Sequence, residues 1–199
     1  MRKIEALITK GRVEEARAAL LQRSERSGGD RERIQVLLRL GHVQYLLDAP
    51  KAGDAYYLEA AEGAHAANLS RETAIALDRI GTRWTDAERY DEAAELVRSW
   101  LGRDIKNSRI WRRLGVIEWY AGNYAEAYAA LTTSLHLGHR RRNILHARGQ
   151  VLAEWGCGVA AIADLDEVLA ADDLSPKARQ AAAGARTAAA AMHRGVPGG

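Results

Sequence analysis

The sequence predicts an all-α protein, an α-solenoid of about five helical hairpins with a C-terminal capping helix. The 199 residues are rich in Ala, Leu, Arg and Glu and include only three prolines, a composition typical of helical globular proteins. Small and large residues also recur with a period of 34. The recurring columns are Gly81, Gly115 and Gly149; Ala93, Ala127 and Ala161; and Val97, Leu131 and Leu165. Such a period is typical of repeat architectures.

The recurring glycine indicates a close contact between two helices. Glycine inside a helix costs about 1 kcal/mol relative to alanine, so its recurrence indicates a packing requirement. With Gly115 on one helix and Ala127 on the next, the two backbones can approach, and large residues such as Leu131 fill the space around them. Each 34-residue unit is therefore expected to be an antiparallel helical hairpin.

The segment 108–141 resembles the tetratricopeptide repeat (TPR) family, whose pattern is W-x2-L-G-x2-Y, then A-x3-F, then P. The matching residues are Trp111, Leu114, Gly115, Gly122, Tyr124, Ala127 and Leu131. Glu118 stands where the family has Tyr, and His139 where it has Pro. The resemblance is strongest over residues 74–175 and weaker before them.

We expect one solenoid domain over residues 1–194, with repeats at 1–30, 31–69, 70–107, 108–141 and 142–175. The first repeat has a shortened first helix, with Gly11 at the turn. In the second, we pair Gly41 with Ala55. Because Gly41 precedes Gly81 by 40 residues, about six extra residues are expected in longer turns such as 48–54.

The end of the chain is expected to cover the last repeat. Ser175 and Pro176 are typical of a helix start, and the polar, alanine-rich segment 176–194 is predicted to be the capping helix that a solenoid needs. Residues 195–199 are expected to form a flexible tail.

No enzyme signature occurs in the sequence, and no catalytic residue, metal site or cofactor is predicted. The single cysteine, Cys157, excludes an intrachain disulfide, and we interpret it as a small turn residue. The cluster of His136, His139 and His146 is interpreted as cationic residues at a helix end. The acidic run is interpreted as a solvated face; it comprises Asp164, Asp166, Glu167, Asp172 and Asp173.

The charge balance and hydropathy disfavour two other classes of protein. The net charge of +3 comes from 29 cationic and 26 anionic residues, which disfavours a nucleic-acid-binding protein. The sequence contains neither a secretory h-region nor an apolar run long enough to span a membrane. We therefore expect a cytoplasmic protein without membrane insertion.

The TPR resemblance implies a partner-binding groove lined by fixed positions on the first helix of each repeat. These positions fall on Gln35, Leu38, His42 and Tyr45; on Asp78 and Thr82; on Arg109, Arg112, Val116, Trp119 and Tyr120; and on Asn143, His146 and Gln150. Some TPR domains clamp a terminal carboxylate with two pairs of residues. Arg109 and Arg113 match the later pair, whereas Leu38 and His42 replace the earlier pair, so the clamp is only half matched.

The sequence thus favours a non-enzymatic protein–protein interaction module, an adaptor or chaperone-like protein that holds a partner segment in its groove. RNA or DNA binding through arginines and aromatic residues is an alternative. A second alternative is self-association as a homodimer, through the first repeat or the last helix.

Overall fold

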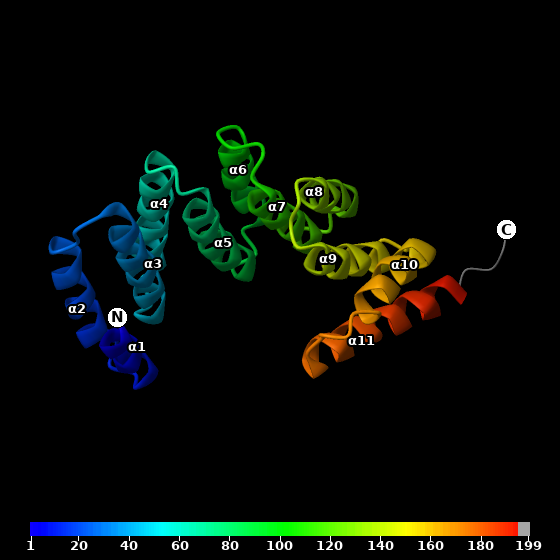
Figure 1. Cartoon of the computed structure of the whole chain (residues 1–199), viewed down its shortest axis with the longest axis horizontal. Coiled ribbons are helices and arrows are strands. Elements are labelled where there is room, and N and C mark those ends of the chain that lie inside the picture. Colours follow the sequence, from blue (N-terminus) through cyan, green and yellow to red (C-terminus); the bar gives the residue numbers. More distant parts are fainter. Residues whose placement is uncertain (195–199) are drawn as a thin grey trace. The chain divides into compact units, whose positions relative to one another are not determined.

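The computed structural model describes residues 1–194, with side chains through residue 191 (Figure 1). In this part of the chain all regular secondary structure is helical. The helices are α1 (Arg2–Thr9), α2 (Val13–Glu25), α3 (Asp30–Leu46), α4 (Pro50–Ala66), α5 (Ser70–Asp86), α6 (Tyr90–Leu101), α7 (Ser108–Tyr120), α8 (Tyr124–His136), α9 (Arg141–Glu154), α10 (Gly158–Leu169) and α11 (Pro176–Arg194). Five consecutive helix pairs followed by α11 confirm the predicted fold class. The expected tail, 195–199, lies outside the described residues.

The chain divides into two compact units, Met1–Arg83 and a second unit that begins at Trp84. In the first unit, α1 packs on α2, α2 on α3, and α3 on α4. In the second unit, consecutive helices pack on one another from α6 to α11, and α11 contacts both α9 and α10 (Figure 1).

The predicted glycine contact is confirmed in two hairpins of the second unit. A Cβ placed on Gly115 would lie 2.7 Å from Cγ of Leu131 and 3.1 Å from the carbonyl oxygen of Ala127. A Cβ on Gly149 would lie 2.7 Å from Cγ of Leu165. Because both leucines are fully buried, only glycine fits at these positions without a movement of the leucine side chain or of its helix.

In the second repeat, the predicted pairing with Ala55 is wrong. Ala55 is exposed. Twelve residues after Gly41 comes Gly53, whose Cβ would lie 3.1 Å from the carbonyl oxygen of Gly41. Sixteen residues after Gly41 comes Tyr57, which is 1% exposed and would lie 2.7 Å from a Cβ on Gly41. Gly53 and Tyr57 therefore take the places that Ala127 and Leu131 hold in α7–α8.

The extra residues before Gly81 lie in longer helices, so the expectation of longer turns is wrong. α3, α4 and α5 each have 17 residues, whereas α7 and α8 each have 13. Pro50 starts α4 at its first turn, a position where proline loses no helical hydrogen bond. Most of the expected long turn, 48–54, is therefore helical.

The acidic run does not form a purely solvated face. Asp164 is 8% exposed and accepts two hydrogen bonds from Arg148, at 2.7 and 2.8 Å. The prediction is wrong for this residue because its carboxylate joins α9 to α10. Three exposed members of the run also have arginine partners, in the pairs Asp166–Arg186, Glu167–Arg141 and Asp173–Arg142.

Candidate partner-binding surfaces

In the first unit, α1, α3 and α5 enclose a pocket of about 400 Å³ that includes predicted groove residues. It is lined by Glu5, Ile8, Gln35, Leu38, Arg39, His42, Ile75 and Arg79. The lining contains both a carboxylate and guanidinium groups. Nε of Arg39 donates to Glu5 at 2.7 Å, and Nη1 of Arg39 donates to the side chain of Gln35 at 3.0 Å. Gln35 and His42 thus line the same pocket.

His42 and Tyr45 belong to a polar cluster around Arg83. The guanidinium of Arg83 lies 3.5 Å from Nδ1 of His42 and 4.9 Å from the centre of the Tyr45 ring. The Tyr45 hydroxyl donates to Asp54. Burial, reinforced by the charges of Arg83 and Arg79, lowers the pKa of His42. Burial and the bond to Asp54 raise the pKa of Tyr45, so the hydroxyl remains a donor.

Asp78 and Thr82 lie half-buried on α5, outside the residues that line this pocket. The Thr82 hydroxyl donates to the carbonyl oxygen of Asp78 at 2.7 Å. This hydroxyl is therefore engaged within its own helix.

In the second unit, the predicted residues of α7 differ in exposure. Arg109 is exposed, Arg112 and Val116 are half-buried, and Arg113 is only 7% exposed. The ring centres of Trp119 and Tyr120 are 5.4 Å apart.

Trp119 is half-buried, and its indole N–H donates to Glu154 of α9 at 2.9 Å. Tyr120 is 58% exposed. Trp119 therefore joins neighbouring repeats, whereas Tyr120 exposes an aromatic surface to solvent.

A second pocket, of about 230 Å³, lies among α7, α9, α10 and the start of α11. It is lined by Arg112, Arg142, Asn143, His146, Val168, Leu174 and Ala178. Three predicted groove residues, Arg112, Asn143 and His146, thus meet at one place. Gln150, further along α9, is half-buried and lies outside the lining.

Sequence reasoning missed the remaining walls of this pocket. Leu174 lies in the turn before α11, at the end of the fifth predicted repeat. Ala178 belongs to the capping helix, which the sequence assigned only to covering the end of the solenoid. Val168 lies on the second helix of its hairpin, and Arg142 precedes the first groove position of its repeat. The repeat register gives no signal for any of these residues.

Additional positive charge surrounds His139, near the start of α9. Burial lowers the pKa of His139, and the charges of Arg112, Arg109 and Arg140 lower it further. Arg109 and Arg140 are both exposed, so this edge of the second unit presents guanidinium groups to solvent.

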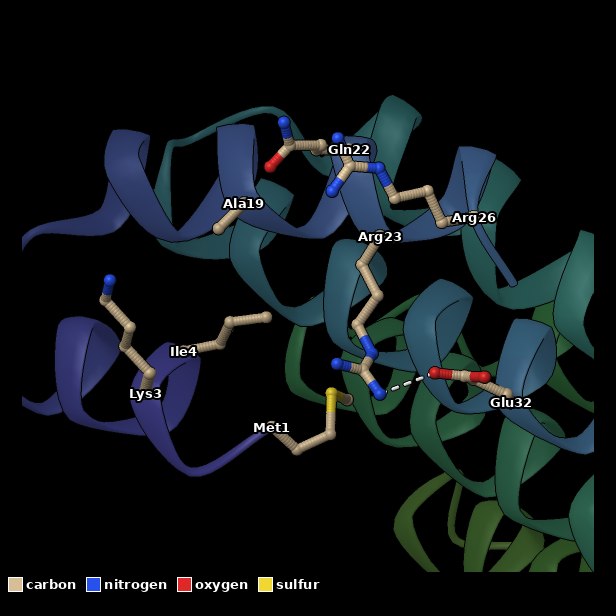
Figure 2. A pocket seen from close by; sticks show the side chains of 8 residues that line it. All are labelled: Met1, Lys3, Ile4, Ala19, Gln22, Arg23, Arg26 and Glu32. Carbon is tan, nitrogen blue, oxygen red and sulfur yellow. Dashed lines mark hydrogen bonds and ion pairs between the residues drawn. The ribbon is translucent and has the colours of Figure 1, made fainter. Parts of the chain in front are cut away.

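A third pocket, of about 370 Å³, lies between α1, α2 and the start of α3 (Figure 2). Met1, Ile4 and Ala19 form its apolar part, and Lys3, Gln22, Arg23, Arg26 and Glu32 complete the lining. In Figure 2 the side chain of Arg23 reaches across to Glu32, and their hydrogen bond is 2.5 Å long. The pocket arises because the eight-residue α1 covers only part of the longer α2.

Other chemical features of the described residues are few. No group of three or more His, Cys, Asp or Glu residues among them could hold a metal ion. Cys157 is exposed in the turn before α10. Among the described residues, every helix is too short or too polar to span a membrane.

Comparison with solved protein structures identifies the fold. No protein-family model and no curated protein matches the chain. Solved structures do: PilF of Pseudomonas aeruginosa matches at 17% identity with a TM-score of 0.60, over 98% of this chain and 90% of that chain. A thermophilic TPR protein of Thermus thermophilus matches at 20% identity with a TM-score of 0.58, over 93% of this chain and 96% of that chain. The TPR2AB domain of yeast Sti1, solved as a pHSP90 complex, matches at 14% identity with a TM-score of 0.50, over 94% of this chain and 83% of that chain. The chain has the tetratricopeptide-repeat fold.

Within the TPR fold, the four clamp positions differ in accessibility. Leu38 and His42 line the pocket of the first unit. In the second unit Arg109 is exposed, whereas the side chain of Arg113 is buried. The half-matched clamp therefore offers one accessible arginine in the second unit.

Glu118, which replaces the usual TPR tyrosine, has a structural role. It is 1% exposed, accepts a hydrogen bond from Nδ2 of Asn123 at 2.9 Å, and pairs with Arg98 of α6. A buried carboxylate with two donors joins α6, α7 and the turn after α7. The departure from the TPR pattern is thus compensated by a partner on the preceding helix.

Proposed function

We propose that this TPR-fold chain is a non-enzymatic protein–protein interaction module that holds a segment of another protein against the first helices of its repeats. The observation that carries the proposal is the lining of the second-unit pocket. Arg112, Asn143 and His146 come from two repeats, and all three occupy positions at which TPR proteins contact their partners. The pocket of the first unit supports the proposal in the same way, through Gln35, Leu38 and His42.

The chemistry of these surfaces suits a peptide segment. Exposed Tyr120 supplies rigid, partly apolar contact area, and Arg109 supplies a charged fork that can pair with carboxylates. The yeast Sti1 domain, solved as a pHSP90 complex, is an example of this fold with a protein ligand. We propose the same class of ligand for this chain, and we place its function in the cytoplasm.

The proposed mechanism is pre-organisation. The first helices are fixed before the partner arrives, because contacts such as Gly115 with Leu131 and Gly149 with Leu165 leave no space for sliding. The partner segment then bears most of the ordering cost, and the module itself loses little conformational entropy on binding.

The first test is affinity purification with mass spectrometry, using wild type beside the variant Arg109→Glu, Arg112→Glu, Tyr120→Ala. We expect a specific protein to co-purify with wild type and to be lost from the variant, since the substitutions reverse two charges and remove one aromatic ring. Circular dichroism checks that the variant is folded. Retention of the same protein by the folded variant would contradict binding at this surface.

A matched control separates this surface from general effects of charge. The variant Arg103→Glu, Tyr128→Ala changes an exposed arginine and an exposed tyrosine of the same unit that lie at none of the groove positions. It is expected to retain the partner. A steep loss of binding affinity between 50 and 200 mM salt, on the order of 10³-fold, would instead favour a nucleic-acid ligand.

The homodimer alternative is tested by light scattering, which measures the mass of the particle in solution.

A further inference from the structure

The second unit carries a group of exposed apolar side chains that lie at none of the groove positions. Tyr128 of α8 is 36% exposed, Trp155 in the turn after α9 is 44% exposed, and Val159 at the start of α10 is 64% exposed. The ring centres of Tyr128 and Trp155 are 6.4 Å apart, so the two rings form one surface. Single exposed apolar residues are ordinary on proteins, whereas a contiguous group of them marks an interaction site.

Exposed alanines extend this surface along α8 and α10, the second helices of their hairpins. Residues three or four apart share one face of a helix, so Ala125 lies on the side of Tyr128 and Ala163 on the side of Val159. Both helices pack on α9. We call the whole set the second-helix patch, which comprises Ala125, Tyr128, Ala129, Trp155, Val159, Ala160 and Ala163, all of them exposed.

The second-helix patch carries no charge. The segments 127–133 and 155–163 contain no Asp, Glu, Lys, Arg or His. The guanidinium of Arg148 lies 5.4 Å from the centre of the Tyr128 ring, and it is neutralised by two hydrogen bonds to Asp164. Glu126 precedes Tyr128 by two residues, which places it roughly 160° around the helix from that ring. The patch therefore offers apolar area without a charge to pair.

A second copy of the chain is the occupant that this chemistry favours. A two-fold contact brings the same surface of both copies together, so an unpaired charge on that surface meets a like charge. An uncharged apolar surface is complementary to itself and avoids this cost. The net charge of +3 for 199 residues adds little long-range repulsion between two copies.

The two places that the sequence suggests for self-association are less suitable. At the first repeat, exposed Lys3 and Arg26 line the pocket between α1 and α2 (Figure 2), so a two-fold contact there brings cations together. The capping helix exposes Lys177 and several alanines, and an alanine buries much less apolar area than an aromatic ring. Tyr128 and Trp155 are of the types that contribute most binding energy at protein interfaces.

We propose that the chain forms a homodimer through the second-helix patch, with Tyr128 and Trp155 of each copy packed against the same patch of the other. The groove residues lie on the first helices of the hairpins, so the dimer leaves the surface of the proposed function free. Two such surfaces in one particle permit bivalent binding of a partner that repeats its segment.

Sedimentation equilibrium of the full chain over a wide range of concentrations tests the proposal. We expect a monomer–dimer equilibrium for wild type. Val159→Glu should weaken the dimer at least about tenfold, because it places an unpaired carboxylate in the contact. Ile105→Glu is the matched control, since Ile105 is equally exposed, at 64%, and lies between α6 and α7, outside the patch. This control should leave the dissociation constant of the dimer unchanged.

A second pair of variants tests the aromatic contact. Trp155→Ala should weaken the dimer at least about tenfold, as expected for a central aromatic residue of an interface. Tyr120→Ala removes another exposed ring of the same unit and should have no effect on the dimer. Since all four substituted residues are exposed or lie in turns, the variants are expected to fold, and circular dichroism checks this.

Three results would overturn the inference. A folded wild type that stays monomeric at every concentration would leave the patch to another occupant or to solvent. A dimer of Val159→Glu as tight as that of wild type would place the contact elsewhere, such as the first repeat or α11. Equal losses for Val159→Glu and Ile105→Glu would show that added charge, and not the patch, is responsible.

The proposed function fails by a separate result, retention of the partner by the folded variant Arg109→Glu, Arg112→Glu, Tyr120→Ala. That variant keeps the whole second-helix patch and is expected to dimerise. The control Arg103→Glu, Tyr128→Ala is expected to weaken the dimer and to retain the partner. The two surfaces are therefore tested independently.

Discussion

The hairpins α3–α4 and α7–α8 achieve the same close contact with different side chains. In α7–α8, Gly115 faces Ala127 and the buried Leu131. In α3–α4, Gly41 faces Gly53 and the buried ring of Tyr57. Glycine stands at position 53 where α8 has alanine, because a Cβ there would lie 2.5 Å from the ring of Tyr45.

The difference extends to the polar groups around the contact. The ring of Tyr45 packs against that of Tyr57 at 6.0 Å and lies beneath the guanidinium of Arg83. Its hydroxyl is bonded to Asp54. The α3–α4 contact thus consists of rigid rings fixed by polar partners, whereas the α7–α8 contact depends on an aliphatic side chain. In both hairpins a Cβ on the first-helix glycine would lie 2.7 Å from the large side chain, although that side chain differs.

Removal of the large side chain is expected to have the largest effect. Tyr57→Ala should lower the free energy of unfolding by about 4 kcal/mol, and Leu131→Ala by about 3 kcal/mol, because each leaves a cavity in a fully buried site. Urea unfolding followed by circular dichroism measures both. The conservative variants Tyr57→Phe and Leu131→Met should each lose less than about 1.5 kcal/mol. Equal losses for the two alanine variants would mean that ring and leucine are energetically equivalent.

The sequence was sufficient to predict the fold class, since glycine and alanine columns with a period of 34 require paired helices. It was insufficient in the second repeat, where Gly53 and Tyr57 break the alanine and leucine columns while keeping their offsets from Gly41. It also misplaced the extra residues of this region, because Pro50 is compatible with a helix start as well as with a turn. A repeat period predicts where two helices touch. It does not predict which side chains make the contact, because both members of a contacting pair can differ from one hairpin to the next.

The candidate site was predictable only in part, for a similar reason. Repeat positions brought Arg112, Asn143 and His146 together because successive first helices lie side by side. They could not indicate that Arg113 is buried. Nor could they place Ala178, because the capping helix lies outside the repeat register and its path depends on packing against α9 and α10. Leu174 lies in the turn that leads into this helix.

Enlarging the glycines is expected to have the next largest effect. Gly41→Ala and Gly115→Ala each place a Cβ 2.7 Å from a buried side chain, and overpacking of this kind costs about 1–3 kcal/mol. The intrinsic helix preference of alanine offsets about 1 kcal/mol. We expect the larger net loss at Gly41, because Tyr57 is a rigid ring whereas Leu131 can change rotamer. Unfolding in urea measures the difference.

Gly63→Ala is the matched control for these variants. Gly63 lies on α4, and the nearest atom to its Cβ would be 3.9 Å away, on Ile34. This substitution should therefore stabilise the protein by up to about 1 kcal/mol, since it gains helix preference without overpacking. A stabilising effect of Gly41→Ala, similar to the one expected for Gly63→Ala, would contradict the idea that the close helix–helix contact requires glycine at position 41.

The turns of the two hairpins give the smallest expected effect. The left-handed turn residue is Asp48 in α3–α4, with φ of 55°, and Gly122 in α7–α8, with φ of 79°. Gly122→Ala should lower stability by about 1 kcal/mol, because alanine is disfavoured in the left-handed conformation. No steric cost is added, since a Cβ at this position would meet no atom within 4 Å. Gly122→Asn should cost less, since asparagine tolerates this conformation, and Asp48→Gly should change stability by less than about 0.5 kcal/mol. Thermal unfolding of the three variants measures these differences. A larger loss for Asp48→Gly than for Gly122→Ala would show that the Asp48 side chain, and not the backbone conformation, sets the geometry of its turn.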